Sequence, residues 1–288
     1  MGAFAPGQEK APGALRKAGL VEQLARAGVD VDDHGDLAVR RWVPDRAHHT
    51  AQHALVIGEV VRETSTAVER MMANGQAALV LGGDCTIELG TVSGVLSTGQ
   101  AVGLIYLDLH PDLNVPTAVP DGALDWMGLA HLIGVEGALV ELAQAGPFAP
   151  MLDPDRVVLL GYGPSQSTAF ERAAIEQYGI TAIPVENVAA SPEAAATAAL
   201  AAIPDTADSV LVHFDVDIVD FTDLPLSEER VRNRGLTFEQ AMRALGTLVA
   251  DERFAGLTIT ELNPDHGAED GSTLKSFVQE LAAVMAPR

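Results

Sequence analysis

The sequence predicts an α/β protein with a doubly wound, mostly parallel sheet and helices on both faces. One observation supports this fold class, and a second supports a single domain. Short apolar runs rich in β-branched residues alternate with longer stretches of helical pattern, and this alternation is typical of parallel sheets that are covered on both sides. The chain also shows no repeat, linker or low-complexity break, so residues 1–288 are predicted to form a single domain.

Six runs are predicted to be strands, because each is short, apolar and bounded by turn residues. In order they are residues 77–84, 102–108, 156–162, 180–185, 209–217 and 257–263. Amphipathic or alanine-rich stretches predict helices at about 47–74, 87–97, 168–178, 192–203, 237–250 and 273–285. One helix has a clear start, because Ser191 can cap it and Pro192 suits its first turn.

The composition excludes several classes of protein. Asp and Glu outnumber Lys and Arg by 40 to 18, and the formal net charge is −22. We therefore expect neither nucleic acid nor an anionic membrane surface as a partner. No segment approaches about 18 uninterrupted apolar residues, so no membrane span is expected. The sequence starts without a secretory pattern and has a single cysteine, which predicts a cytoplasmic location.

Chemically reactive side chains follow four of the predicted strands, at the edge where parallel sheets usually bind ligands. They are Cys85, Asp108, His110, Asp112, Asp215, Asp217 and Glu261. Alternate residues on an extended segment point the same way, so each row of acids is aimed at one space. A single acid at a strand end is more often a solvated residue or a helix cap. Five carboxylates at one edge would repel one another without cations, and carboxylates together with an imidazole suit a pair of divalent transition-metal ions.

Four segments, GGDC, DLHPDLN, HFDVD and ELNP, resemble the signature segments of the arginase–agmatinase (ureohydrolase) family, in the same order and at compatible spacing. The N-terminal segment GQEKAPGALRKAGL is similar to the opening loop and first helix of that family. The resemblance therefore extends over essentially the whole chain. It implies an arginase-like fold with about seven to eight strands, and a homo-oligomer that is a trimer or a hexamer.

The resemblance also implies an activity. Members of this family use two manganese ions to generate a hydroxide that attacks the carbon of a guanidinium group. The expected partner is thus a small guanidino compound, and the reaction is hydrolysis of a C–N bond in a linear amidine. The chemistry is consistent, because a guanidinium is a poor electrophile and two ions ~3.5–4 Å apart can supply hydroxide at neutral pH.

Matching the motifs residue by residue implies roles for individual side chains. One metal position would be bound by Cys85, Asp108, Asp112 and Asp215. The other would be bound by Asp108, His110, Asp215 and Asp217, with Asp108 and Asp215 bridging. Glu261 matches the glutamate that pairs with the substrate guanidinium, and Asn114 matches an asparagine that contacts the α-carboxylate of amino-acid substrates.

Three positions depart from the family pattern. Cys85 stands where the family has histidine; it is either a softer ligand, which favours zinc, iron or cobalt over manganese, or a small buried residue after a tight turn. Asp125 stands where many members have a proton-shuttling histidine, and it could act as an acid or base or cap a helix. His131 is predicted to be a helix-face residue. In the loop 220–236, Glu229 or Arg230 falls near a substrate contact, so the substrate tail could differ from that of arginine.

Two functions follow from these observations. The first is a two-metal amidinohydrolase. Its cysteine resembles that of the enzymes that convert Nω-hydroxy-L-arginine to hydroxyurea and ornithine, and arginine or agmatine, giving urea, are the other candidate substrates. The second is a non-catalytic family member that serves as a metal-binding or assembly subunit, suggested by the changes at Cys85 and Asp125. The complete second set of ligands and Glu261 favour the enzyme, because unfilled carboxylate clusters are costly.

Overall fold

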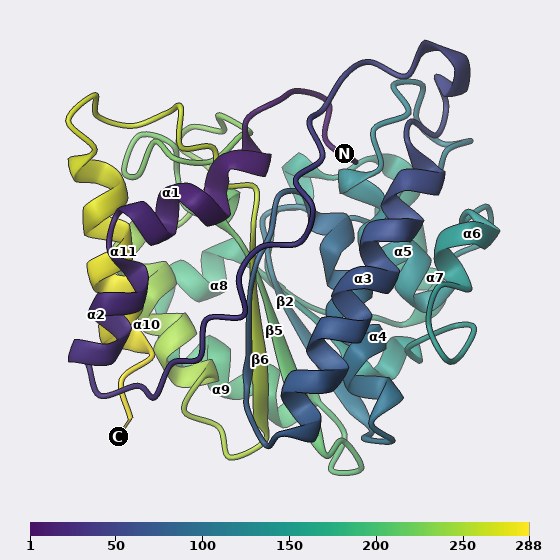
Figure 1. Ribbon diagram of the computed structural model, residues 1–288. Helices are drawn as coiled ribbons and strands as arrows, with labels where there is room; N and C mark the ends of the chain where they lie inside the picture. Colours follow the sequence, from purple (N-terminus) through teal and green to yellow (C-terminus); the bar gives the residue numbers. More distant parts are fainter. Residues whose placement is uncertain (288) are drawn as a thin grey trace.

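A six-stranded sheet lies between two layers of helices in the computed structural model, which describes residues 1–287 (Figure 1). The strands are β1 (Ala78–Leu81), β2 (Val102–Leu107), β3 (Val157–Tyr162), β4 (Thr181–Pro184), β5 (Ser209–Asp215) and β6 (Phe254–Thr260). Their order is β1-β6-β5-β2-β3-β4, and all neighbouring strands are parallel. The predicted fold class is confirmed, and each predicted run overlaps one observed strand.

Each face of the sheet is covered by its own set of helices. One set is α1 (Ala11–Lys17), α2 (Leu20–Arg26), α8 (Val185–Ala190), α9 (Pro192–Ala202), α10 (Phe238–Leu248) and α11 (Ser272–Val284). The other is α3 (Ala54–Ala73), α4 (Glu88–Ser97), α5 (Gly128–Ile133), α6 (Val140–Ala143) and α7 (Ala169–Tyr178). Along β2, Ile105 packs in one core and Leu104 in the other, and neither is exposed. This burial on both faces explains why the strands are continuous apolar runs.

The two central strands, β2 and β5, mark a switch point in the sheet. The chain leaves β2 toward the layer that contains α5, and it leaves β5 toward the layer that contains α10 (Figure 1). Departures in opposite directions open a crevice at the carboxyl ends of the strands, where ligands usually bind. The register pairs Leu107 with Phe214, so the next residues, Asp108 and Asp215, emerge at the same level.

The helix predicted at 47–74 begins later, at Ala54. Asp45 caps a separate short turn at Arg46–His48, and His53 has a left-handed backbone (φ 59°) directly before α3. Farther along, α3 packs closely against α4. A methyl group at Gly94 would lie 2.6 Å from Val68 Cβ, so this contact depends on the missing side chain.

The expectation of about seven to eight strands is wrong for the described residues, which form six. Residues 29–45 follow an irregular path outside the sheet, along α3 and the start of β1 (Figure 1). Arg40 pairs with Glu63 on α3 at 2.6 Å, and His34 Nε2 lies 3.3 Å from Gln76 Oε1. A further strand would need apolar side chains on its faces. Val29 and Val31 pack against the core, but the rest of the segment is charged and mostly exposed, so it does not form a further strand.

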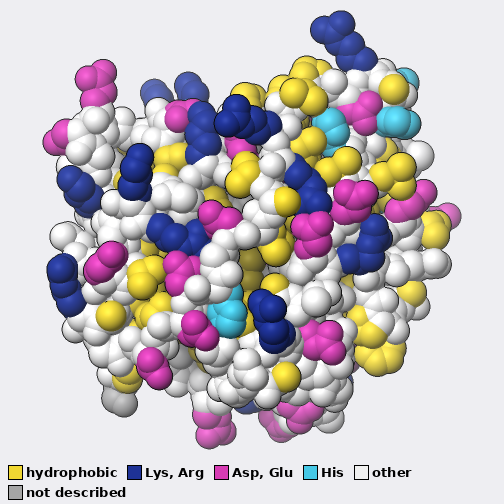
Figure 2. Space-filling model, viewed as in Figure 1, with side chains coloured by type: hydrophobic (Ala, Val, Ile, Leu, Met, Phe, Trp, Pro, Cys, Tyr) yellow, Lys and Arg dark blue, Asp and Glu magenta, His cyan; other side chains and the backbone are white. Residues whose placement is uncertain are grey.

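The surface over this segment is mixed in charge. Acidic and basic side chains are interspersed on the face shown in Figure 2. Among the helices of residues 1–287, none is both long and apolar enough to cross a bilayer.

Candidate metal centre

The same kind of aspartate turn follows β1, β2 and β5. Asp84 accepts a hydrogen bond from Thr86 N (3.2 Å), Asp108 from His110 N (2.6 Å) and Asp215 from Asp217 N (2.7 Å). Each aspartate thus bonds the N–H two residues on, which is how aspartates stabilise tight turns. These turns position the six predicted ligands at the carboxyl edge: Cys85, Asp108, His110, Asp112, Asp215 and Asp217. All of them except His110 are buried.

A first group of possible ligands lies between β1, β2 and β5. It consists of Cys85, Asp108, His213 and Asp215, whose ligand atoms all lie within 4.8 Å of one another. The Cys85 thiol donates to Asp215 Oδ2 at 3.0 Å, and its exposed fraction is 2%. Cys85 therefore lies close enough to the carboxylates to share a cation with them.

A second group adjoins the first and consists of Asp108, His110 and Asp217, again with ligand atoms within 4.8 Å. His110 Nδ1 lies 2.9 Å from Asp217 Oδ2. Asp108 Oδ2 and Asp217 Oδ1 are buried without a hydrogen-bond partner. Buried oxygens without partners are costly, and a cation between them would remove that cost. Asp108 belongs to both groups, as a bridging ligand would.

Asp112 lies beside these groups but belongs to neither. Its Oδ2 accepts a hydrogen bond from the Tyr106 hydroxyl at 2.6 Å, and its backbone is left-handed (φ 49°). The edge thus brings five of the six predicted ligands into the two groups, and the sixth is engaged by a tyrosine.

The electrostatics of the edge favour binding of cations. Burial raises the pKa of Asp108 and of Asp215 well above the usual range, and neighbouring carboxylates raise both further. Burial also raises the pKa of Asp112 to about 7. Burial alone would lower the pKa of His110, but Asp217, Asp112 and Asp215 together outweigh this effect and raise it to about 10. Without a cation the cluster holds protons, which divalent ions would replace. The donor set of carboxylates, imidazole and thiol fits divalent transition-metal ions.

Glu261 follows β6 and lies next to the first group. Its Oε1 is 3.8 Å from Cys85 Sγ, its backbone is left-handed (φ 58°), and its exposed fraction is 5%. Gln8 donates a hydrogen bond to Oε2 through its side-chain amide, which is also buried. Gln8 lies in the N-terminal segment GQEKAPGALRKAGL, but no pattern in that segment predicts its contact with Glu261.

The other predicted residues lie in different surroundings. Asp125 is buried in the short helix Asp125–Met127, and its Oδ1 accepts from Trp126 N at 3.0 Å. Burial, with Asp84 nearby, raises its pKa well above the usual range. Asn114 is fully buried; its Oδ1 accepts from Thr168 Oγ1 at 2.9 Å and its Nδ2 has no partner. His131 lies on α5, as predicted for a helix residue, and its Nδ1 is 2.5 Å from Met127 O.

His213 is a residue that the sequence analysis missed. It lies in the HFDVD segment two positions before Asp215, and it is fully buried. Strand alternation places residues two apart on one face, and that rule was the available signal. His213 lies inside β5, whereas the predicted ligands lie at or beyond the strand ends.

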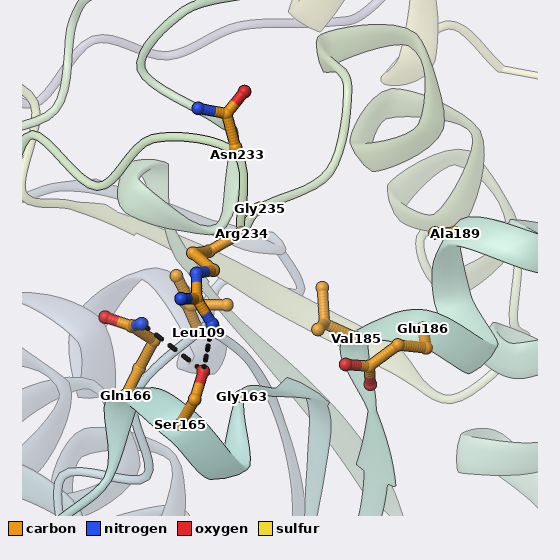
Figure 3. Close-up of a pocket in the computed structure, with 10 residues that line it drawn as sticks. All are labelled: Leu109, Gly163, Ser165, Gln166, Val185, Glu186, Ala189, Asn233, Arg234 and Gly235. Carbon is orange, nitrogen blue, oxygen red and sulfur yellow. Dashed lines mark hydrogen bonds between the residues drawn. The ribbon is translucent and has the colours of Figure 1, made fainter.

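A separate pocket of about 340 Å³ opens at the same edge of the sheet (Figure 3). It is lined by Leu109, Gly163, Ser165, Gln166, Val185, Glu186, Ala189, Asn233, Arg234 and Gly235. Arg234 Nη1 and Gln166 Nε2 both donate to Ser165 Oγ, at 3.2 and 3.4 Å. Leu109, which lines this pocket, lies between Asp108 and His110 in the sequence. None of the candidate ligands lines the pocket.

The fold and the site together define a class of protein: an α/β protein whose acid-rich switch point can hold two metal ions. The model of the arginase family matches residues 1–286, so the chain belongs to the arginase family, as the motifs indicated. Members of this family are hydrolases that act on C–N bonds in linear amidines, and they use a binuclear metal centre.

Individual relatives agree with this assignment. An arginase from Bacillus caldovelox is 29% identical over 265 residues, covering 90% of this chain and 86% of the relative. Human arginase-1 is 24% identical over 284 residues, covering 97% and 87%. The native structure of the Bacillus caldovelox arginase matches this fold with a TM-score of 0.87 at 25% identity, covering 98% of this chain and 95% of that one.

Proposed function

We propose that this protein is a two-metal amidinohydrolase that cleaves the guanidino group of an arginine-like substrate. The observation that carries the proposal is the pair of adjoining ligand groups that share Asp108, with Glu261 next to them. One metal position is assigned Cys85, Asp108, Asp112 and Asp215, and the other Asp108, His110, Asp215 and Asp217. When bound, two divalent ions lower the pKa of a water molecule toward neutrality. Manganese is the favoured ion, and Cys85 makes zinc, iron and cobalt the alternatives.

Glu261 is assigned the role of holding the substrate guanidinium. A carboxylate orients this planar cation through paired, charge-assisted hydrogen bonds. Glu261 is buried beside the first ligand group, so a guanidinium bound to it would lie close to the proposed ions. The Gln8 amide already donates to Oε2, so a cation approaching from the ligand side would meet Oε1 first.

Asp125 is assigned the role of general acid. Its carboxyl group is buried, and this burial raises its pKa well above the usual range, which favours the protonated form. A protonated carboxyl can donate to the leaving amine as the C–N bond breaks. Asn114 is proposed to contact the α-carboxylate of an amino-acid substrate through its Nδ2, which has no partner and can donate while Oδ1 still accepts from Thr168.

The substrate is proposed to be Nω-hydroxy-L-arginine, giving hydroxyurea and ornithine, with arginine or agmatine, giving urea, as the alternatives. Of the two side chains near the expected position of the substrate tail, Arg230 is held by His266 at 2.8 Å. Glu229 is exposed and so is accessible to a positively charged tail. The protein is also proposed to form a homo-oligomer, a trimer or a hexamer.

The test is a panel of guanidino compounds incubated with protein in which the metal has been exchanged systematically. We expect release of urea or hydroxyurea that requires a divalent ion and is lost on chelation. Protein that binds metal but releases neither product from any member of the panel would instead support the non-catalytic alternative.

A further inference from the structure

His213 on β5 is an imidazole whose orientation is fixed by its neighbours. Its ring stacks on Tyr106 of β2 with a centroid separation of 3.9 Å and an interplanar angle of 1°. Its Nδ1 lies 3.2 Å from Oε2 of Glu88, the first residue of α4, and both side chains are fully buried. The function proposed above does not use this residue.

The contacts of the ring distinguish its two nitrogens. Because a carboxylate accepts hydrogen bonds, the contact with Glu88 places the ring proton on Nδ1 and leaves the lone pair on Nε2. Nε2 lies 3.1 Å from Thr260 Oγ1, which lies 3.4 Å from Cys85 Sγ. A histidine that donates one nitrogen to a carboxylate and presents the lone pair of the other has the arrangement typical of metal-binding histidines, and a metal ion would replace the Thr260 hydroxyl at Nε2.

A ring nitrogen of His213 lies within 4.8 Å of the ligand atoms of Cys85, Asp108 and Asp215. We propose that His213 is a ligand of the ion at this first position, and this inference rests on the two-metal centre proposed above. His213 would then take the place assigned above to Asp112, and the ion would be bound by a thiolate, an imidazole and two carboxylates. Four such donors suit the tetrahedral geometry and softer character of zinc better than the preferences of manganese.

The test compares the wild-type protein with His213→Asn. The asparagine amide can still donate to Glu88, but the Nε2 lone pair is removed. Both proteins are loaded with cobalt(II), and metal retention is measured against a graded series of chelators. We expect binding at one of the two positions to weaken by at least about 10-fold. The thiolate-to-cobalt charge-transfer absorption should change as well.

The matched control is His131→Asn, which replaces another fully buried histidine that belongs to neither ligand group. It should leave cobalt retention and absorption unchanged. Unchanged affinity and spectrum in His213→Asn would overturn the inference. A wild-type protein that binds no cobalt would contradict the two-metal proposal itself, so the two failures can be told apart.

A second measurement applies if His213→Asn does not fold. In His110→Asn, His213 is the only histidine that remains in either ligand group. X-ray absorption of this variant loaded with one equivalent of zinc should show a sulfur ligand together with the outer-shell scattering of an imidazole. A spectrum with sulfur and no imidazole would contradict the assignment.

Discussion

Asp215 performs two tasks at the end of β5. One of its oxygens, Oδ1, accepts the N–H of Asp217 at 2.7 Å and so shapes the turn. The other, Oδ2, accepts the thiol of Cys85 at 3.0 Å. The only cysteine of the chain is thus held against a carboxylate from another strand. Burial, and then Asp215, raise the pKa of this thiol well above its usual value, so a metal ion must displace its proton in order to bind.

Replacing Cys85 with histidine should increase manganese retention at the first position, because imidazole binds this ion better than thiolate does. The wild-type first position should also lose its ion at a higher pH than the second as the pH is lowered. Metal content per chain after dialysis against a weak chelator, at several pH values, checks both statements. Equal manganese content and equal metal preference in the two proteins would mean that Cys85 is only a packing residue.

Replacing Glu261 with glutamine should leave the metal content unchanged but reduce kcat/KM by roughly 30- to 1,000-fold. This corresponds to a loss of about 2–4 kcal/mol of transition-state stabilisation, because a charge-assisted pair is removed. Glu280→Gln is a suitable control, because Glu280 is an exposed carboxylate on α11, outside both ligand groups and the pocket at the carboxyl edge. Metal analysis and steady-state kinetics on the three proteins give the comparison. Unchanged kinetics in Glu261→Gln would show that the guanidinium is held elsewhere.

At the scale of elements, the strands were predictable because strands that are buried on both faces consist of continuous apolar residues. The start of α3 was not predictable to the same degree. The pattern from residue 47 onward looks helical, but the cap at Asp45 and the left-handed His53 delay the helix to Ala54. The conformation of the chain before α3 depends on contacts with distant residues, including the hydrogen bond from Gln52 Nε2 to Asp121 O at 2.9 Å.

Part of the candidate site could likewise be predicted from the sequence, and part could not. Residues at strand ends could be predicted to converge, because parallel strands share one edge, and five of the six predicted ligands do so. The hydrogen bond from Tyr106 to Asp112 could not be predicted, because it depends on the three-dimensional turn. The contact between Gln8 and Glu261 joins residues that are 253 positions apart, which no local pattern reveals.

The contact between α3 and α4 gives a test at this scale. Gly94→Ala should destabilise the protein by about 1–3 kcal/mol, since the added methyl group would lie 2.7 Å from Ser65 O and must displace backbone. Gly13→Ala in α1 is the matched control. Nothing lies within 4 Å of its methyl position, so it should be neutral or stabilise by about 0.5–1 kcal/mol. Urea unfolding measures both changes, and equal stability of the two variants would contradict the packing.

For the whole molecule, the cluster couples metal binding to stability and to pH. Without metal, Asp112 has a pKa of about 7 when folded, above the 3.8 of an ordinary aspartate. The pKa of His110 is likewise raised from 6.5 to about 10. Groups with raised pKa values favour the folded state at low pH and lose that contribution as the pH rises through the folded value.

Metal-free protein should therefore show a falling Tm between about pH 5 and 8, and added manganese should reverse or flatten the trend because ions bind the deprotonated groups. Thermal unfolding with and without a chelator measures this dependence. The variant Asp112→Asn should show a smaller slope without metal. A Tm that rises with pH in the metal-free protein would contradict the electrostatics described for the edge.

The most direct test of the account is the number of metal ions bound per chain in Asp108→Asn compared with Asp217→Asn, measured by native mass spectrometry after loading with manganese or zinc. Asp108 belongs to both ligand groups, whereas Asp217 belongs to one. The account predicts two ions in the wild-type protein, about one in Asp217→Asn, and loss of both ions in Asp108→Asn at the same metal concentration. Two ions retained in Asp108→Asn, or one ion at most in the wild-type protein, would contradict a binuclear centre bridged by this residue.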